Sequence, residues 1–353
     1  METKKVKSNK KPNSAVKSCA IVILNWNGKR YLEQFLPSVV EYSFCNGFNI
    51  EVIVADNGSE DGSIGYIEKN FKDVRLIKFD KNYGFTEGYN RALQQVIADY
   101  YLILNSDVLV TQGWLEPMLS FMEAEVHVAA CMPKILSYAN RQQFEYAGAA
   151  GGFIDFFGYP FCRGRILNVV ENDNGQYNEP IPIFWASGAC MLVRSSQFWM
   201  VGGFDNDFFA HMEEIDLCWR LKRNGYAIWC LPQSVVYHVG GGTLAATNPL
   251  KVYFNHRNNL VMLVKNLSRL SLIPVIFTRL VLDGASAAVY LLSGKPKFLL
   301  SVFKAHLHFY LSIPKTIQKR RSFKFSKISL YSNSIVYQYF VRKKRTFYVL
   351  PKV

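Results

Sequence analysis

Carboxylate and imidazole side chains follow apolar segments at several points in the chain. Asp107 comes shortly after the apolar run YYLIL, with Asn105 two residues before it. A carboxylate at the end of a buried strand can hold a divalent cation against a diphosphate, because Mg²⁺ and Mn²⁺ prefer oxygen ligands. Asp107 could instead cap a following helix. His238, which follows the apolar segment VVY, is a candidate further ligand through neutral imidazole, although a single histidine is more often structural.

Nucleotide recognition could come from two other polar segments. Asp56 follows the apolar run VIVA and precedes Asn-Gly-Ser, and a fixed carboxylate there can accept the imide N–H of a pyrimidine base. The alternative is a turn or helix-cap role, which Asp and Asn favour. Gly84, Gly88 and Asn90 lie where a helix opens with small residues, so that the backbone could approach a phosphate or a ribose. Close packing of that helix would favour the same glycines.

Three acids lie close together later in the chain: Glu213, Glu214 and Asp216. They follow the segment GGFD at 202–205 and begin a helix with an apolar face. Acids in a first turn stabilise a helix through its dipole, so stability alone could explain them. The preceding glycine-containing loop suits the rim of an active site, and one of the three acids could then be a general base.

The elements that must position these residues follow a repeated strand-then-helix order. Strands are predicted at 19–25, 51–55, 74–79 and 100–104, and helices near 29–42, from about 61 and over 86–98. Such units predict a parallel, doubly wound α/β sheet, in which ligands bind outside the carboxyl ends of the strands. Later strands are predicted at 183–193 and 227–231. The polar residues described above fall at strand ends, where such a sheet would place a site.

Charge is divided sharply along the chain, whose net charge is +14. Residues 21–250 carry 16 Lys and Arg against 25 Asp and Glu, whereas residues 251–353 carry 19 Lys and Arg against one acid. An acidic body with a basic, aromatic tail argues against a protein that coats nucleic acid. It favours a catalytic domain whose tail meets an anionic membrane surface. The lysine-rich start is predicted to be a disordered arm.

The tail also contains a long apolar segment, 271–293, which could span a bilayer. Arg279 and Asp283 lie near its middle, and central charges make full insertion expensive. The stretch 296–350 interleaves aromatic and basic residues, as interfacial helices do. We therefore expect helices in the plane of the membrane, with a packed soluble helical subdomain and a true span as alternatives.

Seven segments in order carry a resemblance to a known family: VILNWNG (22–28), VADNGSEDGS (54–63), NYGFTEGYNRAL (82–93), LILNSDV (102–108), ASGACMLVR (186–194), GGFDNDFFAHMEEIDLCWRLKRNGY (202–226) and YHVGGGT (237–243). Together they resemble the family 2 glycosyltransferases with a GT-A fold, especially the bacterial rhamnosyltransferase-like branch. The resemblance implies a Rossmann-like, mostly parallel central sheet with a C-terminal basic, aromatic-rich helical appendage. The expected division is a disordered arm at 1–18, a GT-A domain at 19–245 and a helical membrane-associating region at 246–353.

The resemblance also implies a role for each matching residue. Donor contacts are expected from Asn25, Trp26, Asp56, Gly84, Gly88, Asn90 and Asp107. Asp107 and His238 would hold the divalent metal, Mg²⁺ or Mn²⁺, and Gly188 and Glu213 would contact the acceptor or the sugar. Glu214 would be the catalytic base.

Two residues depart from the family pattern. Asn105 stands where many relatives have a second Asp in the metal motif. Glu214 stands where relatives have Asp as the base, so that Glu213 or Asp216 remains a possible base.

The function implied is inverting, non-processive transfer of one sugar in cell-surface glycan synthesis. The donor would be a dTDP- or UDP-linked sugar, and the acceptor a saccharide or polyprenyl-linked saccharide. No Gln-x-x-Arg-Trp motif of processive synthases is present. The enzyme would be peripheral at the cytoplasmic face of a bacterial inner membrane, with no nucleic-acid partner. The alternatives are a nucleotidyltransferase and a non-catalytic, membrane-tethered nucleotide-sugar binding protein.

Overall fold

The computed structural model describes residues 16–240, 248–321 and 328–351. Most of the arm predicted at 1–18 lies outside the described residues, as does the end of the YHVGGGT segment. The first strand already begins at Lys17, inside the predicted arm.

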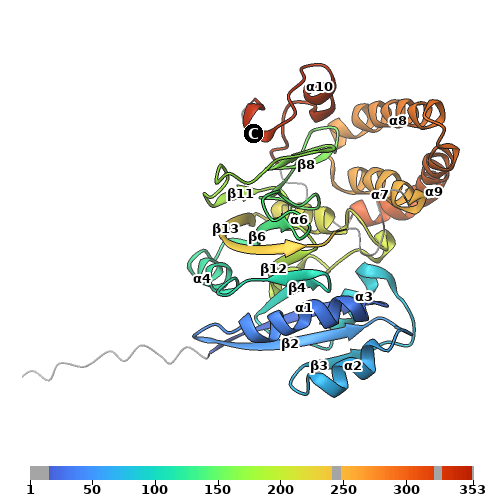
Figure 1. Ribbon diagram of the computed structural model, residues 1–353. Coiled ribbons are helices and arrows are strands. Elements are labelled where there is room, and N and C mark those ends of the chain that lie inside the picture. The colour runs from blue at the N-terminus through green and yellow to red at the C-terminus, as the bar shows by residue number, and fades with distance from the viewer. Residues whose placement is uncertain (1–15, 241–247, 322–327, 352–353) are drawn as a thin grey trace, which may run out of the picture.

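A mostly parallel sheet forms the first half of the body (Figure 1). Its parallel strands are β1 (Lys17–Asn25), β2 (Phe48–Asp56), β3 (Arg75–Lys78) and β4 (Tyr100–Asn105). The helices that follow them in the chain are α1 (Lys29–Tyr42), α2 (Ser63–Asn70) and α3 (Gly84–Leu93). The middle strands are buried because both faces are covered, which explains their unbroken apolar sequences.

The second half of the body extends the same sheet with antiparallel pairings and with the parallel pairing of β13 with β6. The added strands are β5 (Val108–Val110), β6 (Val128–Ser137), β11 (Ile181–Ile183), β12 (Cys190–Arg194) and β13 (Ala227–His238). The order is β11-β13-β6-β12-β4-β1-β2-β3, and β5 pairs with β13. The helices of this half are α4 (Glu116–Ala124), α5 (Ser195–Met200) and α6 (Glu213–Arg223), with the 3-10 helix η1 at Asn206–Phe208.

A smaller, four-stranded sheet lies between β6 and β11 in the chain. Its strands, in the order β10-β9-β8-β7, are β7 (Gly152–Ile154), β8 (Pro160–Cys162), β9 (Arg165–Ile166) and β10 (Val169–Val170). The short helix α10 (Ile335–Phe340) packs against it, since Ile335 and Phe161 share a small core.

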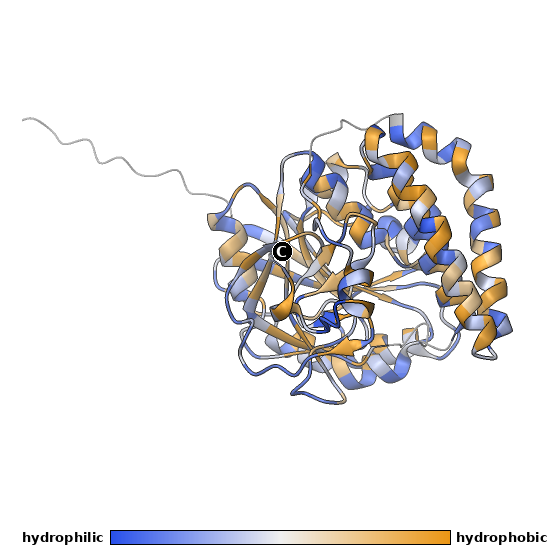
Figure 2. Cartoon of the chain, turned by 90° about the horizontal axis from the view of Figure 1, so that it is seen from above, coloured by the Kyte–Doolittle hydropathy of each residue, from blue (hydrophilic) through white to orange (hydrophobic). Residues whose placement is uncertain are grey.

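Three long helices stand together on one side of the molecule (Figure 1): α7 (Pro249–Asn266), α8 (Arg269–Leu292) and α9 (Pro296–Arg321). The C-terminal part of α7, including Leu260 and Leu263, is buried in the same core as the central sheet. By contrast, Figure 2 shows hydrophobic residues spread along the outer helices, and many on α8 and α9 are exposed. The predicted GT-A-like α/β body with a C-terminal helical region is confirmed.

The strand registers bring the predicted site residues to one edge of the sheet. Asn25 and Asp56 are partners at the ends of β1 and β2, and Leu24 is the partner of Asn105 on β4. On the other side of β4, the end of β13 pairs with β5, which starts one residue after Asp107.

Candidate active site

Asp107 and His238 form a buried pair at this edge. The Nε2 atom of His238 lies 3.1 Å from the Oδ1 atom of Asp107, and both side chains are buried. The two residues are 131 positions apart, and the pairing of β13 with Val108 on β5 brings them together. Asn105 Nδ2 lies 3.5 Å from the same imidazole nitrogen.

A second carboxylate lies behind the imidazole. Glu145 Oε2 is 3.5 Å from His238 Nδ1, and that nitrogen has no hydrogen-bond partner among the described residues. Burial alone would lower the pKa of His238, but the hydrogen bond and charge of Asp107, helped by Glu145, raise it to about 10. Without a cation, the pair is therefore an imidazolium–carboxylate ion pair.

These residues fit a divalent metal. Asp107 and His238 supply one oxygen and one nitrogen ligand close together, and a metal ion can take the place of the imidazole proton. A carboxylate behind a ligating histidine, as Glu145 is placed here, commonly fixes the orientation of the ring. Nothing in the sequence around Glu145 marks it, because only the fold brings it to His238.

Glu214 lies in the first turn of α6. Its side chain is half-buried, and its Oε2 atom has no hydrogen-bond partner among the described residues. Burial raises its pKa to about 7, and backbone hydrogen bonds only partly oppose this. Gly188 packs closely beside it: a Cβ at Gly188 would lie 3.9 Å from Glu214 Cβ and only 3.3 Å from the ring of Phe85. Glu214 thus has the protonation behaviour that a general base needs near neutral pH.

The two neighbouring acids are in different environments. Asp216 is fully buried and accepts hydrogen bonds from Arg220 (2.8 Å), Lys265 (2.9 Å) and Asn266 (2.8 Å). Burial would raise its pKa, but these cations outweigh that effect and lower it. Asp216 therefore holds α6 to α7 and does not suit the role of base. Glu213 is also buried, and burial with the nearby charge of Glu214 raises its pKa well above the usual range.

The residues predicted to surround the base of the donor lie together. Asn25 Nδ2 donates to Asp56 Oδ2 over 2.9 Å, and the other oxygen of Asp56 accepts from the backbone of Ser59, also over 2.9 Å. Asn25 and Asp56 are both fully buried, and Trp26 beside them is 48% exposed. The accessible member of this group is thus Trp26, whereas both oxygens of the buried Asp56 accept hydrogen bonds from within the protein.

The glycines predicted to contact the donor are tightly packed. Gly84 has a φ of +76°, and a Cβ there would lie 2.5 Å from the ring of Phe209. A Cβ at Gly88 would lie 2.9 Å from Leu24. The backbone N–H of Phe85, at the start of α3, donates to the carbonyl of Phe209 over 2.8 Å. In this conformation the start of α3 is closed by the loop before α6.

Asn90 also contacts the loop that covers the start of α3. Its amide donates to the carbonyl of Phe204 (2.8 Å) and to Asn206 (2.7 Å), and it accepts from the backbone N–H of Phe204 (3.0 Å). Asn90 therefore ties α3 to the loop that leads to Glu214. The sequence alone does not indicate that the segment 84–90 packs against this loop.

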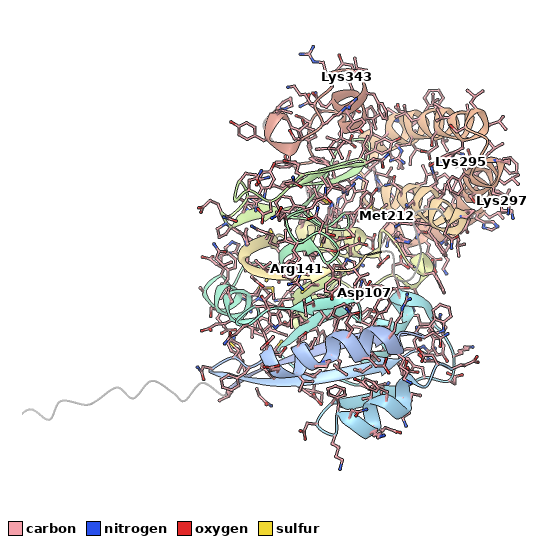
Figure 3. All side chains as sticks on the ribbon, in the orientation of Figure 1. Asp107, Arg141, Met212, Lys295, Lys297 and Lys343 are labelled. Carbon is pink, nitrogen blue, oxygen red and sulfur yellow. The ribbon has the colours of Figure 1, made fainter. Side chains whose placement is uncertain are left out.

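Figure 3 shows where Asp107, of the Asp107–His238 pair, and Met212, at the start of the acidic helix, lie. Asp107 lies at the sheet edge, and Met212, which precedes α6, lies next to α7. A separate cavity of about 760 Å³ lies behind α3 and is lined in part by Arg91, Trp199 and Arg220. Of the predicted site residues, Asn90 alone is among the described residues that line it.

The fold and the polar residues at the carboxyl ends of its strands agree with a glycosyltransferase. The family model described as glycosyl transferase family 2 matches residues 20–201, and the chain belongs to this family. The predicted family and enzyme class are confirmed, and the nucleotidyltransferase and non-catalytic alternatives are set aside.

Relatives and solved structures agree with the assignment. The N-acetylglucosaminyl-diphospho-decaprenol L-rhamnosyltransferase of Mycobacterium tuberculosis is 28% identical over 234 residues, covering 62% of this chain and 75% of the relative. The S. aureus TarS 1–349 structure in complex with UDP-GlcNAc has a TM-score of 0.55 at 16% identity, covering 86% and 83% of the two chains. Mannosyltransferase PcManGT from Pyrobaculum calidifontis, solved with GDP-Man and Mn²⁺, has a TM-score of 0.50 at 14% identity, covering 86% and 84%. The chain is thus rhamnosyltransferase-like in sequence and GT-A-like in fold.

Proposed function

We propose that the enzyme transfers one sugar, with inversion, from a dTDP- or UDP-linked donor to a hydroxyl of a saccharide or polyprenyl-linked saccharide. The observation that carries the proposal is Glu214, a half-buried acid with a pKa of about 7 in the first turn of α6, next to Gly188. Inversion by in-line attack needs one base to take the proton of the acceptor hydroxyl as its oxygen attacks the anomeric carbon. The bond from that carbon to the nucleotide diphosphate breaks, and the diphosphate leaves.

We assign the other site residues around this step. Asp107 and His238 would hold a divalent metal, Mg²⁺ or Mn²⁺, which would supply positive charge for the leaving diphosphate. Trp26 offers a ring face to the base of the donor, with Asn25 and Asp56 beneath it. Gly84, Gly88 and Asn90 serve the donor side by allowing α3 to pack closely on Leu24 of β1 and on the loop before α6. Gly188 and Glu213 border the acceptor side.

The rhamnosyl donor and lipid-linked acceptor are proposed from the M. tuberculosis relative, whose name states both. A polyprenyl-linked acceptor places the enzyme at a membrane. Among the described residues, one helix, α8, is long and apolar enough to cross one. Its Arg279 and Asp283 are buried against the protein, whereas Leu270, Ile273 and Phe277 are exposed. This favours a peripheral enzyme whose helices lie in the plane of the inner membrane at its cytoplasmic face, with the 246–353 region as the attachment.

The test is transfer from dTDP-β-L-rhamnose to N-acetylglucosaminyl-diphospho-polyprenol in the presence of Mn²⁺. The expected product carries one rhamnose in the α configuration, determined by mass spectrometry and by NMR of the anomeric proton. A β-linked product, or a product with many rhamnoses, would contradict inversion or single transfer. If UDP-sugars alone support transfer, the proposal of a rhamnosyl donor is wrong and that of the mechanism stands.

A further inference from the structure

The loop before the acidic helix has an unusual backbone. Phe209, His211 and Met212 have φ values of 63°, 69° and 73°, in the left-handed region that favours glycine. Three such residues within four positions are strained, and strain of this kind persists only where surrounding contacts impose it. Glu213 and Glu214 follow directly, so this backbone sets where the proposed base begins its helix.

One side chain of α7 makes several of the contacts that hold this left-handed backbone. The amide of Asn258 donates to the carbonyl oxygens of Phe208 (2.9 Å), Ala210 (2.8 Å) and His211 (2.8 Å). Asn258 is buried, and Arg257 orients its amide by donating to its Oδ1 atom over 2.9 Å. These carbonyls flank the left-handed residues, so one amide fixes the orientation of the peptide units between them.

The loop is also held by rings and by α3. The ring of Phe209 stacks on Phe254 of α7 with centroids 5.6 Å apart and planes at 13°. The carbonyl of Phe209 accepts from the N–H groups of Phe85 and Thr86, at 2.8 and 3.3 Å. The loop therefore joins α7 to the start of α3, where the donor is proposed to bind.

We propose that Asn258 is a positioning residue for catalysis: it holds the 208–212 loop in the strained conformation that places Glu214. The C-terminal region is then part of the catalytic unit as well as the membrane attachment, and the division predicted at 245 separates Asn258 from the loop that it holds. This inference rests on the proposed role of Glu214 as base.

The chain supplies a matched control in the next residue. Asn259 is on the same helix and is also buried, but its amide donates to the carbonyl of Gly158 over 2.6 Å, outside the loop. Among the described residues, it approaches the loop through a weak 4.0 Å contact with the sulfur of Met212. Asn258→Ala and Asn259→Ala thus remove the same group from the same helix with different partners.

The first test needs no substrate. Hydrogen exchange of the full chain, followed by mass spectrometry, should show faster exchange at 84–87 and 208–214 in Asn258→Ala than in the wild type. Asn259→Ala should leave these peptides unchanged. Equal exchange of the loop in Asn258→Ala and the wild type would overturn the proposal.

The second test is kinetic, with dTDP-β-L-rhamnose as the donor probe and N-acetylglucosaminyl-diphospho-polyprenol as the acceptor. Asn258→Ala should lower kcat by on the order of 10²-fold, the effect of a displacement of about 1 Å in a catalytic group, with donor Kd within about twofold. A loss equal to that of Asn259→Ala, in proportion to a fall in Tm, would show a merely structural role and overturn the proposal.

Two further variants keep the outcomes distinct. If Asn258→Ala does not fold, Arg257→Ala removes only the bond that orients the amide and should produce the same changes in loop exchange and kcat at smaller size. Normal exchange and kcat in Arg257→Ala would then count against the proposal. Glu214→Gln tests the base itself: if it transfers sugar normally, the proposed base fails, whatever Asn258 does to the loop.

Discussion

At the scale of single residues, the rate of transfer should depend on one proton acceptor. Glu214→Gln keeps the shape of the side chain but cannot accept a proton. It should lower kcat by on the order of 10²–10⁴ with donor affinity nearly unchanged. Initial-rate kinetics and calorimetric titration of the donor measure both quantities.

Controls for this substitution are the adjacent acids. Glu213→Gln replaces the neighbouring acid at the same helix end by an amide of the same shape. Asp216→Asn weakens the bonds to Arg220 and Lys265, so it should lower Tm more than kcat. Selective loss of transfer in a folded Glu213→Gln protein would mean that Glu213 is the base.

The pKa of Glu214 also predicts a dependence of stability on pH. The folded pKa of about 7 lies above the ordinary value of a glutamate, so the folded state binds this proton more tightly than the unfolded chain does. The contribution of Glu214 to stability is therefore full below about pH 4 and is lost as pH rises to about 7. Glu214→Gln should have a higher free energy of unfolding than the wild type at pH 8, by on the order of 1–3 kcal/mol. Urea unfolding at pH 8 and pH 4 measures this, and a gain that is equal at both values would contradict it.

The metal pair leads to a separate prediction. Asp107→Asn keeps the size of the side chain but removes the charge that would hold the cation. It should weaken donor binding at least about tenfold, or ~1.4 kcal/mol, when Mg²⁺ or Mn²⁺ is present, and hardly at all in chelator. Calorimetry with dTDP-β-L-rhamnose compares the two conditions. Unchanged affinity with metal would return Asp107 to a structural role beside His238.

At the scale of elements, α8 shows how a helix can carry central charges and still expose an apolar face. Asp283 Oδ1 lies 3.3 Å from both Arg279 and His256, and its other oxygen lies 3.3 Å from His306. Burial would raise the pKa of Asp283, but Arg279 and the two histidines outweigh it and hold this pKa well below its usual range. The charges therefore join α8 to α7 and α9 and leave the outer face apolar.

Removal of the central carboxylate should loosen the three helices. Asp283→Asn leaves Arg279 buried without its ion-pair partner, which typically costs about 3–5 kcal/mol. Thermal unfolding at pH 7 should show a clear fall in Tm. Glu68→Gln, which removes an exposed partner of Lys78, is the control and should cost at most about 1 kcal/mol. Equal effects of the two substitutions would mean that the Asp283 cluster contributes little.

At the scale of the whole molecule, the basic segment 251–353 includes α8 with its exposed apolar residues. Flotation with anionic vesicles should exceed that with neutral vesicles and should weaken as salt rises, because the charges are screened. Phe277→Asp should reduce binding at every salt concentration, since the residue is 68% exposed on the apolar face. Ile97→Asp is the control, because Ile97 is fully exposed on the body. Equal loss in both variants, or equal binding to both vesicles, would contradict a specific membrane face.

The sequence by itself was sufficient for the fold family, the parallel strand-then-helix units and the sheet edge that collects Asn25, Asp56 and Asp107. These follow from local patterns, because apolar runs form strands and polar residues end them. The sequence also marked Glu214, but left Glu213 and Asp216 as alternatives. Nothing local distinguishes three acids in one helical turn.

Only the tertiary structure decided what each of these side chains contacts. In the folded chain, Asp216 accepts from Lys265, which is 49 residues away. Asn258 donates to three loop carbonyls about 50 residues away. The fold also buries Asp283 between the C-terminal helices, which a hydropathy pattern along one helix does not reveal. Burial and hydrogen bonding between distant segments set the pKa of a carboxylate and the shape of a strained loop. For this enzyme, those contacts distinguish Asp216, which bonds to Arg220 and Lys265, from Glu214, the proposed base.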